Sequence, residues 1–261
     1  MSAPSESGRP LSLRARAEAG ERLIGALLRM PAEELVEMLA VSGFDFVLID
    51  AEHGPADVIA LRQHIAVASV HGVPVVVRVG EDDPGMILRV LDQGAQGVLV
   101  PHVDDARAAA AVVAASHYPP LGTRGFATYS RAGRFGETAA ADHRDWYLDN
   151  TLVLGMIESP AGVAAADAIA ATPGLDGIMI GPADLAASTG PDDLAVPEAT
   201  ALVNRAVAAA GKMRMDIVGT PAAATAAFDD GARLVVYNLA SSLMTHLRGL
   251  RAPADRPQPG R

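Results

Sequence analysis

The chain has 261 residues, half of them hydrophobic and only 4 % aromatic, and its formal net charge is −10. This acidic balance argues against binding to nucleic acid or to an anionic membrane surface. The absence of cysteine excludes disulfides, thiolate metal sites and cysteine nucleophiles. No apolar run of about 20 residues could span a membrane, and residues 1–10 are polar and lack a signal-peptide core. We expect a cytoplasmic protein with an aliphatic core.

Short apolar runs alternate with helical patterns along the chain. Strands are predicted at 22–27, 45–50, 74–79, 97–101, 152–157, 177–180, 213–219 and 234–237, and helices at 31–41, 57–70, 84–93, 105–115, 160–171, 198–210 and 221–229. Several strands are continuous runs of Val, Ile and Leu, as in parallel sheets covered on both faces. This order predicts a (β/α)8 TIM barrel, which typically needs roughly 250 residues. A doubly wound open sheet is the alternative, but no Gly-x-Gly-x-x-Gly follows the first strand.

The remaining segments interrupt this rhythm. Residues 118–150 predict a long loop after the fourth strand, with a helix at 138–148. We expect residues 1–12 to be disordered, residues 13–250 to form the single barrel domain, and the proline-rich residues 251–261 to be a flexible tail.

Polar residues follow the carboxyl ends of most predicted strands. In a barrel these ends meet at one mouth, where active sites form. The residues gathered there are Asp50, Glu52, His53, Arg78, His102, Glu158, the segment 181–184, Thr220 and Asn238.

Two of these carboxylates predict a metal site. Glu158 ends the fifth strand and Asp184 follows the sixth, and oxygen ligands from neighbouring strands suit a hard divalent cation such as Mg²⁺ or Mn²⁺. The competing interpretations are a helix cap at Asp184 for residues 185–188 and a solvated side chain at Glu158.

Three further features could carry chemistry. The backbone N–H groups of Gly181, Ala183 and Asp184 could bind a carboxylate or a phosphate, although a tight turn would also need this sequence. His53 is a candidate general base, against the alternative of an exposed loop histidine. Arg78 ends the third strand and could face an anion or oxyanion, unless it reaches the surface.

The sequence predicts no direct catalytic role for three other polar residues. His102 is expected to line the mouth rather than to react, and Asp92 considered alone is a helix-surface residue. Lys212, the single lysine, precedes the seventh strand and therefore lies at the opposite end of the barrel. A Schiff-base mechanism is disfavoured, which leaves metal-assisted enolisation.

Several motifs together resemble the HpcH/HpaI aldolase/citrate lyase family. They are GFDFVLIDAEHG at 43–54, VR at 77–78, LDQGA at 91–95, YPPLGTRG at 118–125, ES at 158–159 and GPADL at 181–185. The chain looks most similar to the class II pyruvate aldolases, and the resemblance extends over residues 13–250. It implies a barrel that assembles as a homo-oligomer, a hexamer or a dimer, whose subunits exchange a C-terminal helix.

The resemblance also implies roles for single residues. Glu158 and Asp184 would ligate Mg²⁺, Mn²⁺ or Co²⁺, and pyruvate would chelate that ion while the amides of Ala183 and Asp184 hold its carboxylate. His53 would be the acid/base group, and Asp92 would raise its basicity.

Further implied roles concern the substrate. Arg78 would stabilise the enolate oxygen, Ile217 would touch the aldehyde, and Asp50 would belong to the substrate-binding set. The chain departs from the family pattern at Met156, where glutamine is usual, and at 238–240, where Asn-Leu-Ala replaces Gly-x-Asp.

We expect a metal-dependent aldolase that cleaves or forms a 4-hydroxy-2-oxo acid from pyruvate and an aldehyde. The departures leave two alternatives open. One is a decarboxylase or carbon–carbon bond-forming enzyme that uses the same enolate with an unusual acceptor. The other is a catalytically silent barrel that binds a keto acid.

Overall fold

The computed structural model describes residues 12–251, which form a closed barrel of eight parallel strands in sequential order. The strands are β1 (Leu23–Leu28), β2 (Phe46–Asp50), β3 (Val75–Arg78), β4 (Gly97–Val100), β5 (Leu152–Ile157), β6 (Gly177–Ile180), β7 (Met213–Val218) and β8 (Leu234–Asn238). The predicted TIM-barrel fold and its eight strands are confirmed, and the strand ends differ from the prediction by at most one residue.

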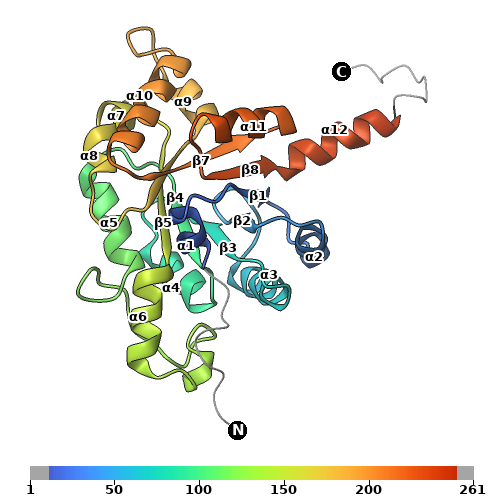
Figure 1. Cartoon of the computed structure of the whole chain (residues 1–261), viewed down its shortest axis with the longest axis vertical. Helices are drawn as coiled ribbons and strands as arrows, with labels where there is room; N and C mark the ends of the chain where they lie inside the picture. The colour runs from blue at the N-terminus through green and yellow to red at the C-terminus, as the bar shows by residue number, and fades with distance from the viewer. Residues whose placement is uncertain (1–11, 252–261) are drawn as a thin grey trace.

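Helices connect the strands and surround the barrel (Figure 1). They are α1 (Leu13–Glu18), α2 (Glu33–Val41), α3 (Val58–Val70), α4 (Pro84–Asp92), α5 (Ala106–Ser116), α6 (Ala140–Asn150), α7 (Pro160–Ala164), α8 (Ala166–Ala170), α9 (Pro182–Ser188), α10 (Val196–Ala209), α11 (Pro221–Asp229) and α12 (Leu239–Arg251), with a 3₁₀ turn η2 (Arg134–Gly136). None of the helices within residues 12–251 has the length and hydropathy that crossing a bilayer requires.

The helix predictions need three corrections. The helix predicted over 160–171 is divided into α7 and α8 at Ala165. The short helix α1 was not predicted, and it places Ser12, expected to be disordered, as its N-cap. The rest of the two predicted disordered ends lies outside the described residues, except Arg251, which ends α12.

Alternate residues of each strand face the barrel interior, as the period of two requires. The resulting inner cluster holds Leu23, Leu27, Phe46, Leu48, Val76, Leu99, Leu152, Leu154, Met156, Met179, Met213, Met215, Leu234 and Val236. A Cβ atom at Gly25 would lie 2.5 Å from the Phe46 ring, so glycine makes room for this large side chain. The same alternation carries Asp50, Arg78 and Glu158 to the inner side at the carboxyl end.

One end of this interior is closed by α1, whose Leu13 and Ala17 are buried. Lys212 lies at the same end, where its Nζ donates to the Leu175 carbonyl at 2.6 Å. This confirms the prediction that Lys212 is remote from the mouth. Helix α12 has no buried residue and projects away from the barrel (Figure 1, red).

Candidate active site

Asp50 and Arg78 form the central ion pair of the mouth. They are register partners on β2 and β3, and Arg78 binds both carboxylate oxygens, Nε to Oδ1 at 2.9 Å and Nη2 to Oδ2 at 2.5 Å. Arg29 adds a third bond, from Nε to Oδ2 at 2.8 Å. Burial alone would raise the pKa of Asp50, but the hydrogen bonds and charge of Arg78 outweigh it and lower that pKa. Asp50 therefore stays ionised and holds Arg78 in place.

Glu52 and His53 follow β2 on the segment that leaves Asp50. The backbone N–H groups of both residues donate to Asp50 Oδ1 at 3.2 Å, which ties the segment to the strand end. Glu52 Oε2 lies 3.2 Å from Arg78 Nε and 3.9 Å from His53 Nε2. The His53 side chain is 54 % exposed, so it can exchange protons with a bound molecule or with water.

Glu158 follows β5 and is buried at the centre of the mouth, with 2 % of its side chain exposed. Its Oε1 accepts a hydrogen bond from the backbone N–H of His102 at 3.0 Å and lies 3.4 Å from His102 Nδ1. Burial raises the pKa of Glu158, and the charges of Glu52 and Asp184 add to this increase, whereas His102 opposes it. Such a carboxylate gains from a cation placed beside it.

Gly181 lets the chain pass close to Glu158. A Cβ atom at this position would lie 2.3 Å from Glu158 Oε2, so any other residue would displace the carboxylate. Gly181 is also the N-cap of α9, with Pro182 in its first turn. Asp184 lies in that first turn and is not the cap of a helix over 185–188, which corrects the structural alternative considered for it.

A cavity of about 330 Å³ opens at the mouth beside Gly181 and Asp184. Its apolar lining includes Leu27, Leu48, Leu99, Met156, Met179, Ala183 and Ile217, and its polar lining includes Arg29, Arg78, Asp184, Asn238 and Ser241. The Met156 thioether lies 4.0 Å from Arg78 Nη1, in the position where an amide would offer a stronger acceptor. The predicted residues Arg78, Met156, Gly181, Ala183, Asp184 and Ile217 therefore share one cavity.

Asp92 lies elsewhere. It ends α4, and its Oδ1 accepts a bond of 2.6 Å from Arg124 Nη2. Arg124 is buried against the rings of Tyr118 and Tyr147. Within the described chain, Asp92 has no hydrogen bond or ion pair with His53, so one subunit does not assemble the dyad that the resemblance implies.

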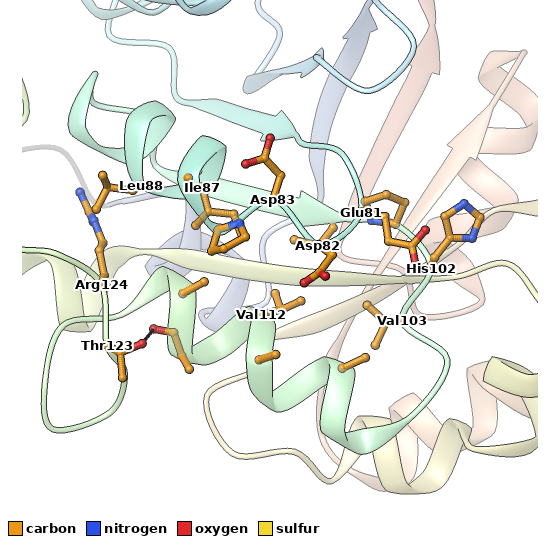
Figure 2. Close-up of a pocket in the computed structure, with 18 of the residues that line it drawn as sticks. Glu81, Asp82, Asp83, Ile87, Leu88, His102, Val103, Val112, Thr123 and Arg124 are labelled. Carbon is orange, nitrogen blue, oxygen red and sulfur yellow. Dashed lines mark hydrogen bonds between the residues drawn. The ribbon is translucent and has the colours of Figure 1, made fainter.

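A larger cavity of about 720 Å³ lies between α4 and α5. Figure 2 shows Glu81, Asp82 and His102 at one end of it and Arg124 at the other, with Ile87, Leu88 and Val112 between them. Among the described residues that line this larger cavity, His102 also belongs to the cluster with Glu52 and Glu158.

Three residues contribute more to the mouth than the sequence indicated. Glu52 received no role, His102 was expected only to line the mouth, and Arg29 was not considered. Arg29 could have been found because it continues the inward alternation of β1 beyond Leu27. Nothing in the local sequence shows that the His102 backbone turns back toward Glu158.

Comparison with known proteins finds a matching family. The HpcH/HpaI aldolase/citrate lyase profile matches residues 26–246. The chain belongs to this family. It is therefore an enzyme of the lyase class, and the family resemblance seen in the sequence is confirmed.

Individual relatives support the assignment. The chain is 38 % identical over 205 residues to a pyruvate aldolase of Rhizobium etli, which covers 78 % of each chain. It is 36 % identical over 231 residues to a 2-keto-3-deoxy-L-rhamnonate aldolase of Klebsiella pneumoniae, covering 87 % of this chain and 86 % of the relative. The crystal structure of an HpcH/HpaI aldolase from Desulfitobacterium hafniense matches with a TM-score of 0.86 at 25 % identity, covering 97 % of this chain and all of the other.

Proposed function

We propose that this enzyme is a divalent-metal-dependent aldolase that acts on a 4-hydroxy-2-oxo acid. It would cleave the bond between C3 and C4 to release pyruvate and an aldehyde, or form that bond in reverse. The names of the two curated relatives, a pyruvate aldolase and a 2-keto-3-deoxy-L-rhamnonate aldolase, support this substrate class. The observation that carries the proposal is a small cavity lined by Arg78, Gly181 and Asp184, where Gly181 passes close to the buried Glu158.

The carboxylates of the mouth fit a divalent cation. Glu158 is buried beside Glu52, whose Oε2 has no hydrogen-bond partner in the described part of the chain. Glu158 and Asp184 would hold Mg²⁺, Mn²⁺ or Co²⁺. Such an ion, when bound, acts as a Lewis acid toward a keto oxygen.

Other groups around the cavity would bind the substrate carboxylate and stabilise the charge that develops on the substrate. The N–H groups of Ala183 and Asp184 lie in the first turn of α9, where helices lack internal acceptors, and would bind the substrate carboxylate. Arg78 would stabilise the negative charge that develops on the keto oxygen. Asp50 would act by orienting Arg78, because both of its oxygens are already occupied.

His53 would move the proton. Its exposed imidazole would take the proton from the C4 hydroxyl as the C3–C4 bond breaks and give it to C3 of the resulting enolate, so that pyruvate is released; the reverse reaction would run these transfers backwards. Ile217 and Met156 would contact the aldehyde part, since both line the cavity. Asp92 would raise the basicity of His53 only across a subunit interface, because within one chain it pairs with Arg124.

We also propose that the protein is a homo-oligomer, a dimer or a hexamer, whose subunits exchange α12. This helix buries none of its residues, and Met244, Leu247 and Leu250 are exposed apolar side chains on it. A helix of this kind is stabilised when another surface covers its apolar face. Light scattering of the wild type and of Leu247→Glu tests this, with a smaller assembly expected for the variant. The cytoplasmic location stays a prediction.

Oxaloacetate decarboxylation provides the direct test, because it passes through the same pyruvate enolate. We expect the purified protein to decarboxylate oxaloacetate with Mg²⁺, Mn²⁺ or Co²⁺, to lose this activity with a chelator, and to regain it when the metal is restored. A folded protein that is inactive with all three ions and binds pyruvate without metal would contradict the proposal and support a silent keto-acid-binding barrel.

Met156 favours a second candidate, in which the same enolate reacts with an unusual acceptor. The thioether leaves Arg78 Nη1 without the amide acceptor that the family commonly has. If oxaloacetate is decarboxylated but simple 4-hydroxy-2-oxo acids are not cleaved, the enzyme is a decarboxylase or a carbon–carbon bond-forming enzyme rather than an ordinary aldolase.

A further inference from the structure

We propose that His102 is a direct metal ligand through its Nδ1, and that it makes the site select transition-metal ions over Mg²⁺. The inference rests on the proposed metal-dependent function and adds an imidazole ligand to that site. The metal pair implied by the family resemblance is Glu158 and Asp184, and it contains oxygen donors alone.

The first observation is the clustering of ligand atoms. One ligand atom each from Glu52, His102 and Glu158 lies within 4.8 Å of the other two. Ligands that share one metal ion at about 2.0–2.3 Å are themselves roughly 3–4.5 Å apart, so small adjustments would bring all three to one ion. Glu52 and Glu158 come from β2 and β5, on different sides of the barrel, and His102 follows β4.

The second observation is the backbone at His102. Its φ is +52°, in the left-handed region that non-glycine residues seldom occupy. Two hydrogen bonds hold it there, from His102 N to Glu158 Oε1 at 3.0 Å and from Val103 N to the Met156 carbonyl at 2.9 Å. The conformation keeps the imidazole Nδ1 3.4 Å from Glu158. Strained residues of this kind are concentrated at functional sites.

The third observation is an unbalanced charge. Glu52 and Glu158 are two carboxylates close together in a mostly buried site, with 14 % and 2 % of their side chains exposed. Glu52 Oε2 is buried and accepts no hydrogen bond from any described residue. Arg78 is the cation beside it, at 3.2 Å, but its hydrogen bonds go to Asp50. A divalent ion would neutralise the pair and give this oxygen a partner.

The chemical type of the ligand atoms decides which divalent ion the site binds most tightly. Mg²⁺ favours oxygen ligands and keeps much of its water, whereas Mn²⁺, Co²⁺ and Zn²⁺ accept imidazole, Co²⁺ and Zn²⁺ more strongly. An imidazole among carboxylates should therefore strengthen binding of Co²⁺ far more than that of Mg²⁺.

Calorimetric titration of wild type and His102→Gln with Co²⁺ and with Mg²⁺ tests the proposal. We expect the variant to bind Co²⁺ about 10–100-fold more weakly. Its affinity for Mg²⁺ should change less than about threefold. His71→Gln is the matched control, because His71, which follows α3, also has its Nε2 3.4 Å from a glutamate, Glu37 on α2. We expect no change in either affinity for this variant. Equal changes for both ions, or none, in His102→Gln would overturn the proposal.

A second measurement needs no variant. Spin-echo modulation of the Mn²⁺-loaded wild type should show a directly bound imidazole nitrogen, which shifts when histidine is ¹⁵N-labelled, and its absence would overturn the proposal. The proposed function is judged separately, by decarboxylation with Mg²⁺. If that activity is present and the nitrogen signal is absent, His102 only positions Glu158 and the aldolase assignment stands.

Discussion

The two ends of the barrel both bury carboxylates, and Asp176 at the amino end is paired differently from Glu52 at the carboxyl end. At the amino end, Asp176 forms an ion pair with Arg14 at 3.1 Å and accepts a hydrogen bond from Val153 N at 2.7 Å. At the carboxyl end, Glu52 and Glu158 are crowded together, and a buried oxygen of Glu52 has no hydrogen-bond partner among the described residues.

This difference separates structural charges from functional ones. A buried charge that is fully paired contributes to a defined fold, and the amino end of a barrel is where such interactions serve stability. Carboxylates left partly unpaired around a cavity are available to a ligand. We therefore expect substitutions at the carboxyl end to reduce activity and those at the amino end to reduce stability.

The largest effect is expected for Glu158→Gln. Loss of this carboxylate should lower kcat for oxaloacetate decarboxylation by about 10³-fold, as when a key electrostatic group is removed from an active site. Stability should be unchanged or higher, since burial raises the pKa of Glu158 and the neutral amide avoids that cost. Steady-state kinetics and urea unfolding measure both. If the variant keeps its activity, the carboxylates at the carboxyl end are not functional charges as proposed.

Arg14→Ala should show the opposite pattern. It leaves Asp176 buried without its cation, which costs about 3 kcal/mol of unfolding free energy. The kcat of the folded protein should be unchanged. Arg107→Ala is the control, because this exposed arginine is 4.0 Å from Asp105 and should change stability by less than about 0.5 kcal/mol. A loss of kcat in Arg14→Ala would show that the two ends are coupled.

The pH dependence of stability should also come from the amino end. Burial, with the charges of Arg14 and Arg124, lowers the pKa of His117 to about 4. The unfolded chain binds this proton near pH 6.5, so stability is lost as pH falls from about 6.5 to 4, by about 3 kcal/mol. Burial raises the pKa of Asp176 to about 6, which has the opposite sign: stability is gained as pH falls from about 6 toward 4.

Between pH 4 and 6 the two contributions should nearly cancel in the wild type. His117→Gln removes one of them, so its unfolding free energy should rise as pH falls from 6 to 4. Urea unfolding at several pH values measures this. If the variant and the wild type have the same pH dependence, the imidazole does not titrate as described.

The smallest effects are expected for two helix caps. Ser12 Oγ accepts from Ala15 N at 3.2 Å at the amino end, and Ser159 Oγ accepts from Gly162 N at 3.0 Å beside Glu158. Either serine to alanine should cost about 1 kcal/mol of stability. Only Ser159→Ala should also lower activity, by about 10-fold, because it loosens the segment that positions Glu158. Equal activities in the two variants would argue against this.

Most of the fold was predictable because strand patterns are local. Short apolar runs, several of them continuous in Val, Ile and Leu, predicted all eight strands. The position of Asp50, Arg78 and Glu158 at the carboxyl ends of their strands predicted that they lie at the mouth. Helix α1 was not predicted because a six-residue segment has too short a pattern, and it is stabilised by burial of Leu13 and Ala17.

The site was predictable only in part. The resemblance implies that Asp92 serves His53, but tertiary packing pairs it with Arg124 within one chain. His102 acquires its importance from a positive φ that depends on bonds to β5, and no local pattern encodes that conformation.

The amino-acid order by itself determined the barrel, the end at which polar groups gather and the family to which the chain belongs. Tertiary structure decided which of those groups meet: Glu52 and His102 join Glu158, and Gly181 leaves room for its carboxylate. The physical reason is the sequence separation of the residues that interact. Strand patterns follow from neighbouring residues, whereas the distance between side chains from different strands depends on how the closed sheet brings distant segments together.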